Sequence, residues 1–336
     1  MMKNAEVFSS TPVHRPGTGL PDPRILSIAI VTHGRVQKLQ QLLNSISGSQ
    51  LIHELLSRII IVDDSPGRMN FNAKSPAMVD YVWLPERIFI TRAKNIAWKR
   101  AITPLILFID DDNVIKEESV LHLLKVIEKH PEIGALMPSV SYLSQPGRIW
   151  VYSAPFRKGR WSMDLTGRNS VEKVIPDYDL MSTDALPNAF IIRRSILFSV
   201  SGFDEEFTHN NSCDLCQRIK LSGHEVYASA VSRFYHDVQP PNHRGYWADH
   251  VVADRDRAFP ESRDWTLLMR KIHGKKSMRS PLLYLHLAWW ILQVDLGIIL
   301  MGTPPGNFIG INVAFLKGFL TGARVKIFQY YDGERD

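Results

Sequence analysis

Three adjacent carboxylates are the residues most suited to chemistry in this chain. Asp110, Asp111 and Asp112 follow the apolar run LILFI at residues 105–109. Adjacent carboxylates repel one another unless a cation or hydrogen bonds compensate their charge. Mg²⁺ and Mn²⁺ prefer oxygen ligands and can bridge a protein to a diphosphate. We interpret the triplet as a metal site, while a solvated acidic loop is the alternative that an isolated Asp run would favour.

A second acidic pair supports this interpretation. Asp63 and Asp64 follow the apolar run IIIV at residues 59–62. In open α/β sheets, ligands bind at the carboxyl ends of the strands. Two acidic clusters that each end a buried strand therefore predict one shared site.

The elements around these acids alternate between strand and helix patterns. We expect strands at 25–32, 58–62, 105–109 and 226–235, short extended segments at 81–84 and 88–90, and helices at 36–46, 91–101, 117–129 and around 214–222. Continuously apolar strands in such an alternation predict a mostly parallel sheet covered by helices on both faces.

The C-terminal part contains two strongly apolar stretches, 282–301 and 308–320. The first is long enough to span a bilayer, but His286, Gln293 and Asp295 would be costly in hydrocarbon. Trp289 and Trp290, with lysines just upstream, favour a helix that lies on a membrane surface. A helix packed on the rest of the protein is the alternative.

Composition sets further limits. The 336 residues carry a formal net charge of +6, which favours anionic partners without choosing among them. Cys213 and Cys216 cannot build a disulfide framework, so we expect core packing for this C-x-x-C and a reducing, cytoplasmic compartment. Residues 1–24 are expected to form a flexible tail, 25–240 a catalytic domain and 241–336 a helical extension.

The chain resembles the family 2 glycosyltransferases, which have a GT-A fold. The resemblance runs from about Ser27 to His236, and no single motif carries it alone. It rests on SIAIVTHGR at 27–35, IIIVDDS at 59–65, RAKNIAWKRA at 92–101, LILFIDDDN at 105–113, the stretch 188–207, and CDLCQRIKLSGHEVY at 213–227.

The resemblance implies a role for each matching residue. Those implied to bind the nucleotide-sugar donor are Thr32, His33, Arg35, Asp63, Asp64, Lys94, Asn95, Asp110 and Asp111. Asp110 and Asp112 match the family's DXD acids, and His236 resembles the histidine that often completes the metal shell. The implied cofactor is Mg²⁺ or Mn²⁺. The expected acceptor is a hydroxyl of a glycan, a lipid-linked glycan or a polysaccharide. We expect no nucleic-acid partner, and the membrane-surface contact that the C-terminal sequence favours would run through residues 280–326.

One departure from the family pattern concerns the catalytic base. Many inverting relatives carry Glu-Asp just before the helix, where this chain has Asn211 and Ser212. A serine is a poor general base near neutral pH. We expect Asp214 to take this role or Asp184 to be recruited, although Asp214 could instead stabilise the N-terminus of the helix.

Three other functions compete with a glycosyltransferase. A nucleotide-sugar-binding pseudoenzyme would explain the altered base position. A haloacid-dehalogenase-like phosphatase would fit DDDNV at 110–114, but it needs a second acidic pair downstream, whereas Asp63 and Asp64 lie upstream. A sugar nucleotidyltransferase needs a glycine-rich loop after the first strand, and this loop contains only Gly34.

Overall fold

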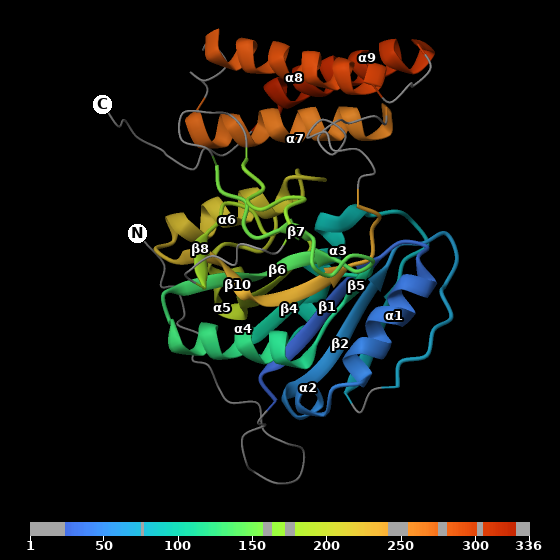
Figure 1. The fold of residues 1–336 in the computed structure, drawn as a ribbon, viewed down its shortest axis with the longest axis vertical. Coiled ribbons are helices and arrows are strands. Elements are labelled where there is room, and N and C mark those ends of the chain that lie inside the picture. The colour runs from blue at the N-terminus through green and yellow to red at the C-terminus, as the bar shows by residue number, and fades with distance from the viewer. Residues whose placement is uncertain are drawn as a thin grey trace, which may run out of the picture.

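A computed structural model gives the fold of the chain (Figure 1). It describes residues 24–74, 77–156, 163–171, 179–240, 255–274, 281–300 and 305–326. The tail predicted for 1–24 lies outside the described residues except for Arg24.

The centre of the molecule is a ten-stranded mixed sheet with the order β3-β2-β1-β4-β9-β6-β10-β5, in which β7 pairs with β6 and β8 with β10. The strands are β1 (Leu26–Thr32), β2 (Leu56–Asp63), β3 (Met78–Trp83), β4 (Leu105–Asp110), β5 (Asn113–Val114), β6 (Ile133–Tyr142), β7 (Ile149–Val151), β8 (Leu180–Ser182), β9 (Ala189–Arg193) and β10 (Glu225–His236). Strands β3, β2, β1 and β4 are parallel, as are β6 and β10, and β9 runs antiparallel between β4 and β6. The predicted mostly parallel sheet is confirmed.

Helices cover both faces of the sheet. They are α1 (Val36–Ser47), α2 (Gln50–Leu55), α3 (Phe89–Arg100), α4 (Glu117–Lys129), α5 (Arg194–Ser199) and α6 (Asn211–Leu221). On β1, Ile28 and Ile30 belong to the core that contains α1, α2 and α4, whereas Ala29 belongs to the core that contains α3, α5 and α6. This alternation follows from the two-residue period of a strand, and it explains why β1 is apolar throughout.

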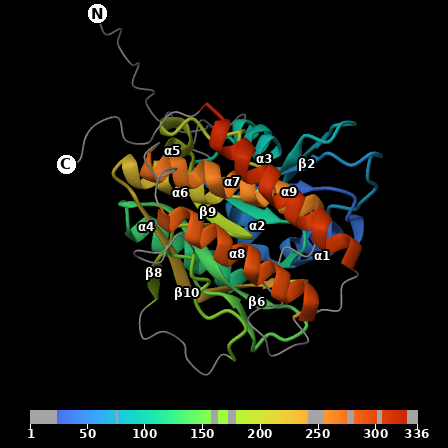
Figure 2. The same cartoon turned by 90° about the horizontal axis from the view of Figure 1, so that it is seen from above.

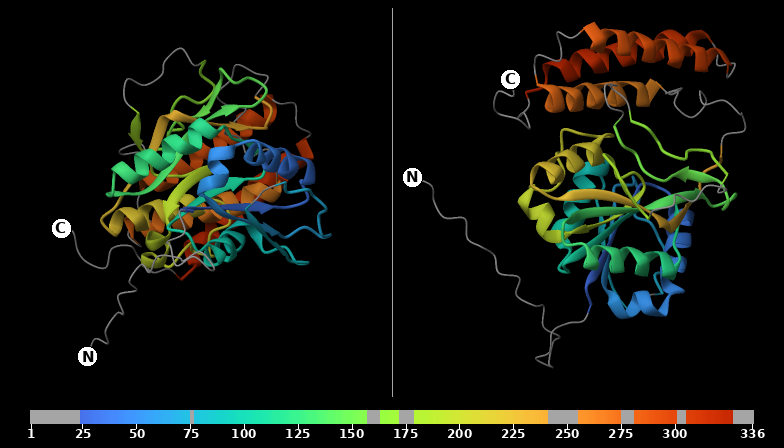
Figure 3. Two further views of the ribbon diagram at one scale, coloured as in Figure 1. Left: turned by 90° about the horizontal axis from the view of Figure 1, so that it is seen from below. Right: turned by 60° about the vertical axis from the view of Figure 1, so that its left-hand side comes forward.

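The C-terminal part is helical, as predicted. It contains α7 (Arg255–His273), α8 (Pro281–Leu300) and α9 (Pro305–Arg324). Helix α7 lies between the sheet domain and the layer formed by α8 and α9 (Figures 1 and 3). The view from above shows the outer two helices lying over α7 (Figure 2). In the described part of the chain, no helix combines the length and apolarity needed to cross a membrane.

Three elements differ from the sequence prediction. Residues 88–90 are not extended, because Asp64 caps the start of α3 there. Strand β6 was not predicted because Pro138 interrupts its pattern; this proline lies where the register with β10 shifts. Helix α7 was also missed, since it contains Pro260 and many charges.

Candidate active site

The loop after β1 joins the two acidic clusters at the carboxyl edge of the sheet. Thr32 Oγ1 donates a hydrogen bond of 2.6 Å to Oδ2 of Asp111, which directly follows the neighbouring strand β4. On the other side, His33 Nδ1 lies 2.9 Å from Asp64 Oδ1, which follows β2. Because β1 is paired in parallel with both β2 and β4, the two acidic clusters flank its end. The prediction that both clusters lie at one edge of the sheet is therefore correct.

Arg35 supplies the positive charge that faces the acidic triplet. Its Nη2 lies 2.5 Å from Asp111 Oδ1, and its Nη1 lies 2.8 Å from Asp112 Oδ2. The guanidinium side chain is 45% exposed, while the Asp111 side chain is fully buried. Because the Arg35 side chain is half-exposed, it can move away from the two buried carboxylates without rearrangement of the core.

The three carboxylates differ in their proton affinities. Burial raises the pKa of Asp110, partly offset by Lys94, and burial raises the pKa of Asp111 to about 6 despite Arg35 and Thr32. Burial would also raise the pKa of Asp112, but His236 and Arg35 hold it below its ordinary value. Asp112 is therefore the member of the triplet that carries negative charge over the widest pH range.

Asp112 and His236 have the donor set that a divalent cation requires. His236 Nε2 lies 3.3 Å from Asp112 Oδ1, which has no hydrogen-bond partner although it is buried. Neighbouring ligands of an octahedral cation with bonds of about 2.1 Å are about 3 Å apart, so this separation fits such an ion. The described residues contain no cluster of three or more His, Cys, Asp or Glu arranged around one point. The two residues thus fit part of a metal shell, and Mg²⁺ commonly completes such a shell with substrate phosphates and water.

The pair after β2 is held mainly by structural contacts. Asp63 is buried and accepts hydrogen bonds from the Ser65 amide and from Tyr81 Oη, the latter at 2.5 Å. Asp64 Oδ2 accepts the backbone amides of Ile88 and Phe89 at 3.0 Å each, which caps α3. The donor-binding roles implied for both residues stay predictions.

Lys94 and Asn95 on α3 lie beneath the site. Lys94 is buried against the rings of Phe190 and Phe203, and its burial lowers its pKa even though Asp110 acts in the opposite direction. The Asn95 amide donates to the Phe203 carbonyl at 2.9 Å and accepts from the Phe203 amide. Asn95 therefore anchors the segment before α6, at a point where Gly202 has a φ of +71° and no room for a Cβ.

A cavity of about 980 Å³ opens in front of the sheet edge. The predicted residues that line it are Thr32, His33, Arg35, Asp64 and Asp110. Its other walls come from Arg87, Phe89 and Ile90, from Glu205, Glu206, Thr208 and His209, and from Asp256, Arg257, Phe259, Pro260 and Arg263 on α7. Sequence reasoning missed these walls, because their positions depend on how the C-terminal helix packs.

Phe89 is an unusual part of this wall. Its φ is +61°, a left-handed conformation that is costly for an aromatic residue, and its side chain is 51% exposed. The conformation lets its amide and that of Ile88 reach the same oxygen of Asp64. The Phe89 amide thus binds Asp64, while the Phe89 side chain forms part of the cavity wall.

The two predicted base candidates lie outside the residues that line the cavity. Asp214 is fully buried, with Oδ2 2.8 Å from Arg218 Nε and Oδ1 2.7 Å from Lys271 Nζ on α7. Asp184 accepts hydrogen bonds from Lys220 Nζ at 2.6 Å and from the Phe156 amide at 2.7 Å. Both carboxylates hold neighbouring elements together, and their catalytic roles stay predictions.

The sequence profile of glycosyl transferase family 2 matches residues 27–204, more than half of the chain. The chain belongs to this family. The match includes β1, both acidic clusters and α3, and it makes the protein a glycosyltransferase. No curated protein sequence matches the chain significantly.

Solved structures support the GT-A fold of this glycosyltransferase. One is a crystal structure of GalNAc-T7 with UDP, GalNAc and Mn²⁺, with a TM-score of 0.55 and 14% identity over 75% of this chain. The glycosyltransferase spans about half of that protein, 49% of its length. Another is the mannosyltransferase PcManGT from Pyrobaculum calidifontis with GDP-Man and Mn²⁺, with a TM-score of 0.50 and 13% identity over 88% of this chain and 89% of the other. At these identities the likeness concerns the fold.

Proposed function

We propose that this glycosyltransferase transfers a sugar from a nucleoside-diphosphate sugar to an acceptor hydroxyl in the cavity beside Asp110. The observation that carries the proposal is the bridge that Thr32 and His33 form between the two acidic clusters at the wall of that cavity, with Thr32 on Asp111 and His33 on Asp64. The cavity has the size of a small-molecule site. The lining combines acidic side chains with four arginines, and an arginine can bind a diphosphate through two parallel hydrogen bonds; these arginines are Arg35, Arg87, Arg257 and Arg263.

Asp112 and His236 are the residues proposed to hold Mg²⁺ or Mn²⁺, with Asp110 near the ribose and the ion. Such an ion stabilises the charge that develops on a departing nucleoside diphosphate. Asp112 can serve because its buried Oδ1 faces His236 Nε2 at 3.3 Å and makes no well-formed hydrogen bond with another group. The bound Mn²⁺ of the structurally similar proteins supports this choice of ion.

The reaction also requires a group that accepts the proton of the acceptor hydroxyl. In the inverting reaction that we propose, the acceptor oxygen bonds to the anomeric carbon while that carbon's bond to the diphosphate oxygen breaks. Asp214 and Asp184 are both engaged elsewhere. His209 is exposed, lines the cavity and lies two residues before the start of α6, so we propose that it takes the proton.

The donor site and the base can be tested separately. A panel of nucleotide sugars, each with Mn²⁺, should include one that raises the melting temperature, because a ligand that binds the folded state stabilises it. Asp112→Ala should abolish that metal-dependent shift without loss of the fold, and full transfer activity in this variant would refute the metal assignment. His209→Gln should lower kcat roughly 100-fold with unchanged donor binding. If instead only Asp214→Asn lowers kcat by that amount, Asp214 is the base and His209 is not.

Two finer parts of the proposal concern acceptor and location. The acceptor is proposed to be a glycan or lipid-linked hydroxyl. We also propose a cytoplasmic protein whose C-terminal helices contact a membrane surface; its two cysteines are buried and unpaired, which agrees with a reducing compartment. Binding of donor without transfer to any acceptor would instead favour a nucleotide-sugar-binding protein.

A further inference from the structure

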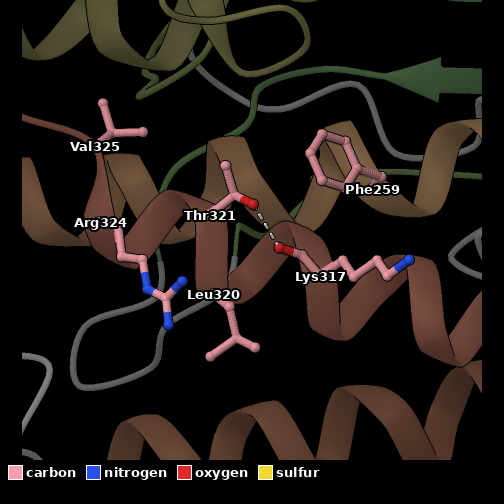
Figure 4. A pocket seen from close by; sticks show the side chains of 6 residues that line it. All are labelled: Phe259, Lys317, Leu320, Thr321, Arg324 and Val325. Carbon is pink, nitrogen blue, oxygen red and sulfur yellow. Dashed lines mark hydrogen bonds between the residues drawn. The ribbon is translucent and has the colours of Figure 1, made fainter.

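Three hollows along α7 share the residue Phe259. One is the cavity beside the acidic triplet. The second, of about 440 Å³, lies between α7 and α9 and includes Pro260, Val313 and Lys317. The third, of about 590 Å³, continues along α9 past Lys317 to Arg324 (Figure 4). Together the second and third hollows form what we call the α7–α9 trench, which begins at the donor cavity.

The trench has a rigid floor because α7 and α9 pack very closely. Gly318 and Gly322 bring the backbone of α9 so near to α7 that a Cβ at either position would clash with it. Ser262 Oγ donates to the Phe315 carbonyl at 2.7 Å, and Arg270 Nη1 donates to the Gly322 carbonyl at 2.5 Å. Polar side chains of α7 thus donate hydrogen bonds to backbone carbonyls of α9. These bonds hold α9 in place, and with it the side chains on its outer face.

The outer layer presents apolar side chains to solvent at helical spacing. On α8 the exposed residues include Leu285 at 65% and Trp289 at 51%, and on α9 they include Ile309 at 68% and Leu320 at 50%. The intervals 285–289 and 309–313 are one turn, so each helix has an apolar stripe on its outside. Soluble proteins rarely expose such continuous apolar surface unless it binds something.

The charge of this part of the chain identifies the kind of partner. The segment 275–326 contains six basic residues (Lys275, Lys276, Arg279, Lys317, Arg324 and Lys326) and one acid, Asp295. Asp295 accepts a hydrogen bond of 2.7 Å from Asn312 Nδ2. Among the described residues, neither Lys317 nor Arg324 pairs with an acid, and both lie beside apolar side chains of the trench (Figure 4).

We propose that the α8–α9 face docks on an anionic lipid surface and that the α7–α9 trench seats a phospholipid headgroup beside the donor cavity. Lys317 and Arg324 bind the lipid phosphate, while Leu320 and Phe259 contact its apolar part. Docking of a second copy of this chain on the α8–α9 face would bring two basic faces together, and their repulsion disfavours a dimer through this face. The position of the headgroup beside a donor site rests on the proposed function, because that function assigns the neighbouring cavity to the donor.

Vesicle flotation of the full chain tests the docking. We expect binding to phosphatidylcholine vesicles that contain phosphatidylglycerol, weaker binding without it, and loss of binding at high salt. Lys317→Glu with Arg324→Glu should weaken this binding at least about tenfold. The matched control reverses the charge of two exposed lysines one helical turn apart on α4, Lys125→Glu with Lys129→Glu, and should bind like the wild type.

Several outcomes would overturn the proposal. Equal binding to both kinds of vesicle, or an equal loss in the α4 control, would remove the role of the trench cations. A dimer in sedimentation velocity that the Lys317 and Arg324 changes dissociate would assign the face to a second copy. The melting shift with nucleotide sugar and Mn²⁺ is measured on the same variants. If no donor binds even the wild type, the proposed function fails, while the vesicle result stands on its own.

Discussion

Removal of the Arg35 guanidinium should tighten the binding of a divalent cation. In the structure this group occupies the space in front of Asp111 and Asp112, at 2.5 and 2.8 Å from their oxygens. A cation held by Asp112 Oδ1 and His236 would share the Asp112 carboxylate with the Arg35 guanidinium on Oδ2, so repulsion between the two positive charges weakens the ion pairs of Arg35. Arg35→Gln abolishes that cost, because the amide carries no charge.

The size of the effect follows from the exposure of the pair. Charge-assisted hydrogen bonds contribute about 1.5–3 kcal/mol each when buried, but the Arg35 side chain is 45% exposed and screened by water. We take about 1–2 kcal/mol for the two together, which corresponds to roughly tenfold in affinity at about 1.4 kcal/mol per decade. The same change should weaken binding of a nucleoside diphosphate, since it removes a cation from the cavity wall.

Calorimetric titration of Mn²⁺ into the ligand-free protein measures this affinity. The titration belongs at about pH 8, since the pKa of Asp111 is raised to about 6 and loss of Arg35 raises it further. Arg87→Gln is the matched control, because Arg87 lines the same cavity but lies over the ring of Phe89. If folded Arg35→Gln binds Mn²⁺ no more tightly than the wild type, Arg35 does not compete with the metal.

Three further predictions concern the frame around the site. Lys271→Met should destabilise the fold by about 3 kcal/mol, as expected when the buried Asp214–Lys271 ion pair loses one partner. Lys271 also pairs with Asp204. Burial would raise the pKa of Asp204, but Lys271 lowers it, so the stabilisation from this second pair holds above about pH 4 and is lost as the pH falls further; the denaturant melts of the two proteins should therefore move closer together in acid. Burial raises the pKa of Cys213 to about 12 and that of Cys216 well above its ordinary value, so a thiol reagent at pH 8 should modify neither until the protein unfolds. Gly318→Val should cost about 1–3 kcal/mol by separation of α7 from α9, and an unchanged melting temperature would contradict the close packing.

The sheet edge could be predicted from the sequence because its signals are local. The apolar runs before Asp63 and Asp110 identify buried strands, and the carboxyl ends of parallel strands meet at one edge. Thr32 and Arg35 were implied as donor-binding residues by the family resemblance, and their contacts with Asp111 and Asp112 were not predicted.

Other features depend on contacts between distant segments. The sequence around Asp214 does not predict its ion pair with Lys271, which lies 57 residues later in the chain. Pro138 disfavours a strand and Pro260 disfavours a helix. Tertiary packing overrides both preferences, and the residues lie in β6 and α7 respectively. The part of the cavity wall that α7 supplies was missed for the same reason.

The placement of α7 has a consequence for biosynthesis. The last strand of the sheet ends at residue 236 and α9 ends at residue 324, so 324 − 236 = 88 residues separate them. At about 5–20 residues per second, the ribosome needs roughly 4–18 seconds to add that stretch. Until Lys271 is added, 271 − 236 = 35 residues after the end of β10, the nascent chain has its acidic triplet, yet Asp214 has no Lys271 and the cavity lacks the side that α7 supplies. A chain whose translation stops early would carry the family's sequence signature on an enzyme that cannot enclose its substrate.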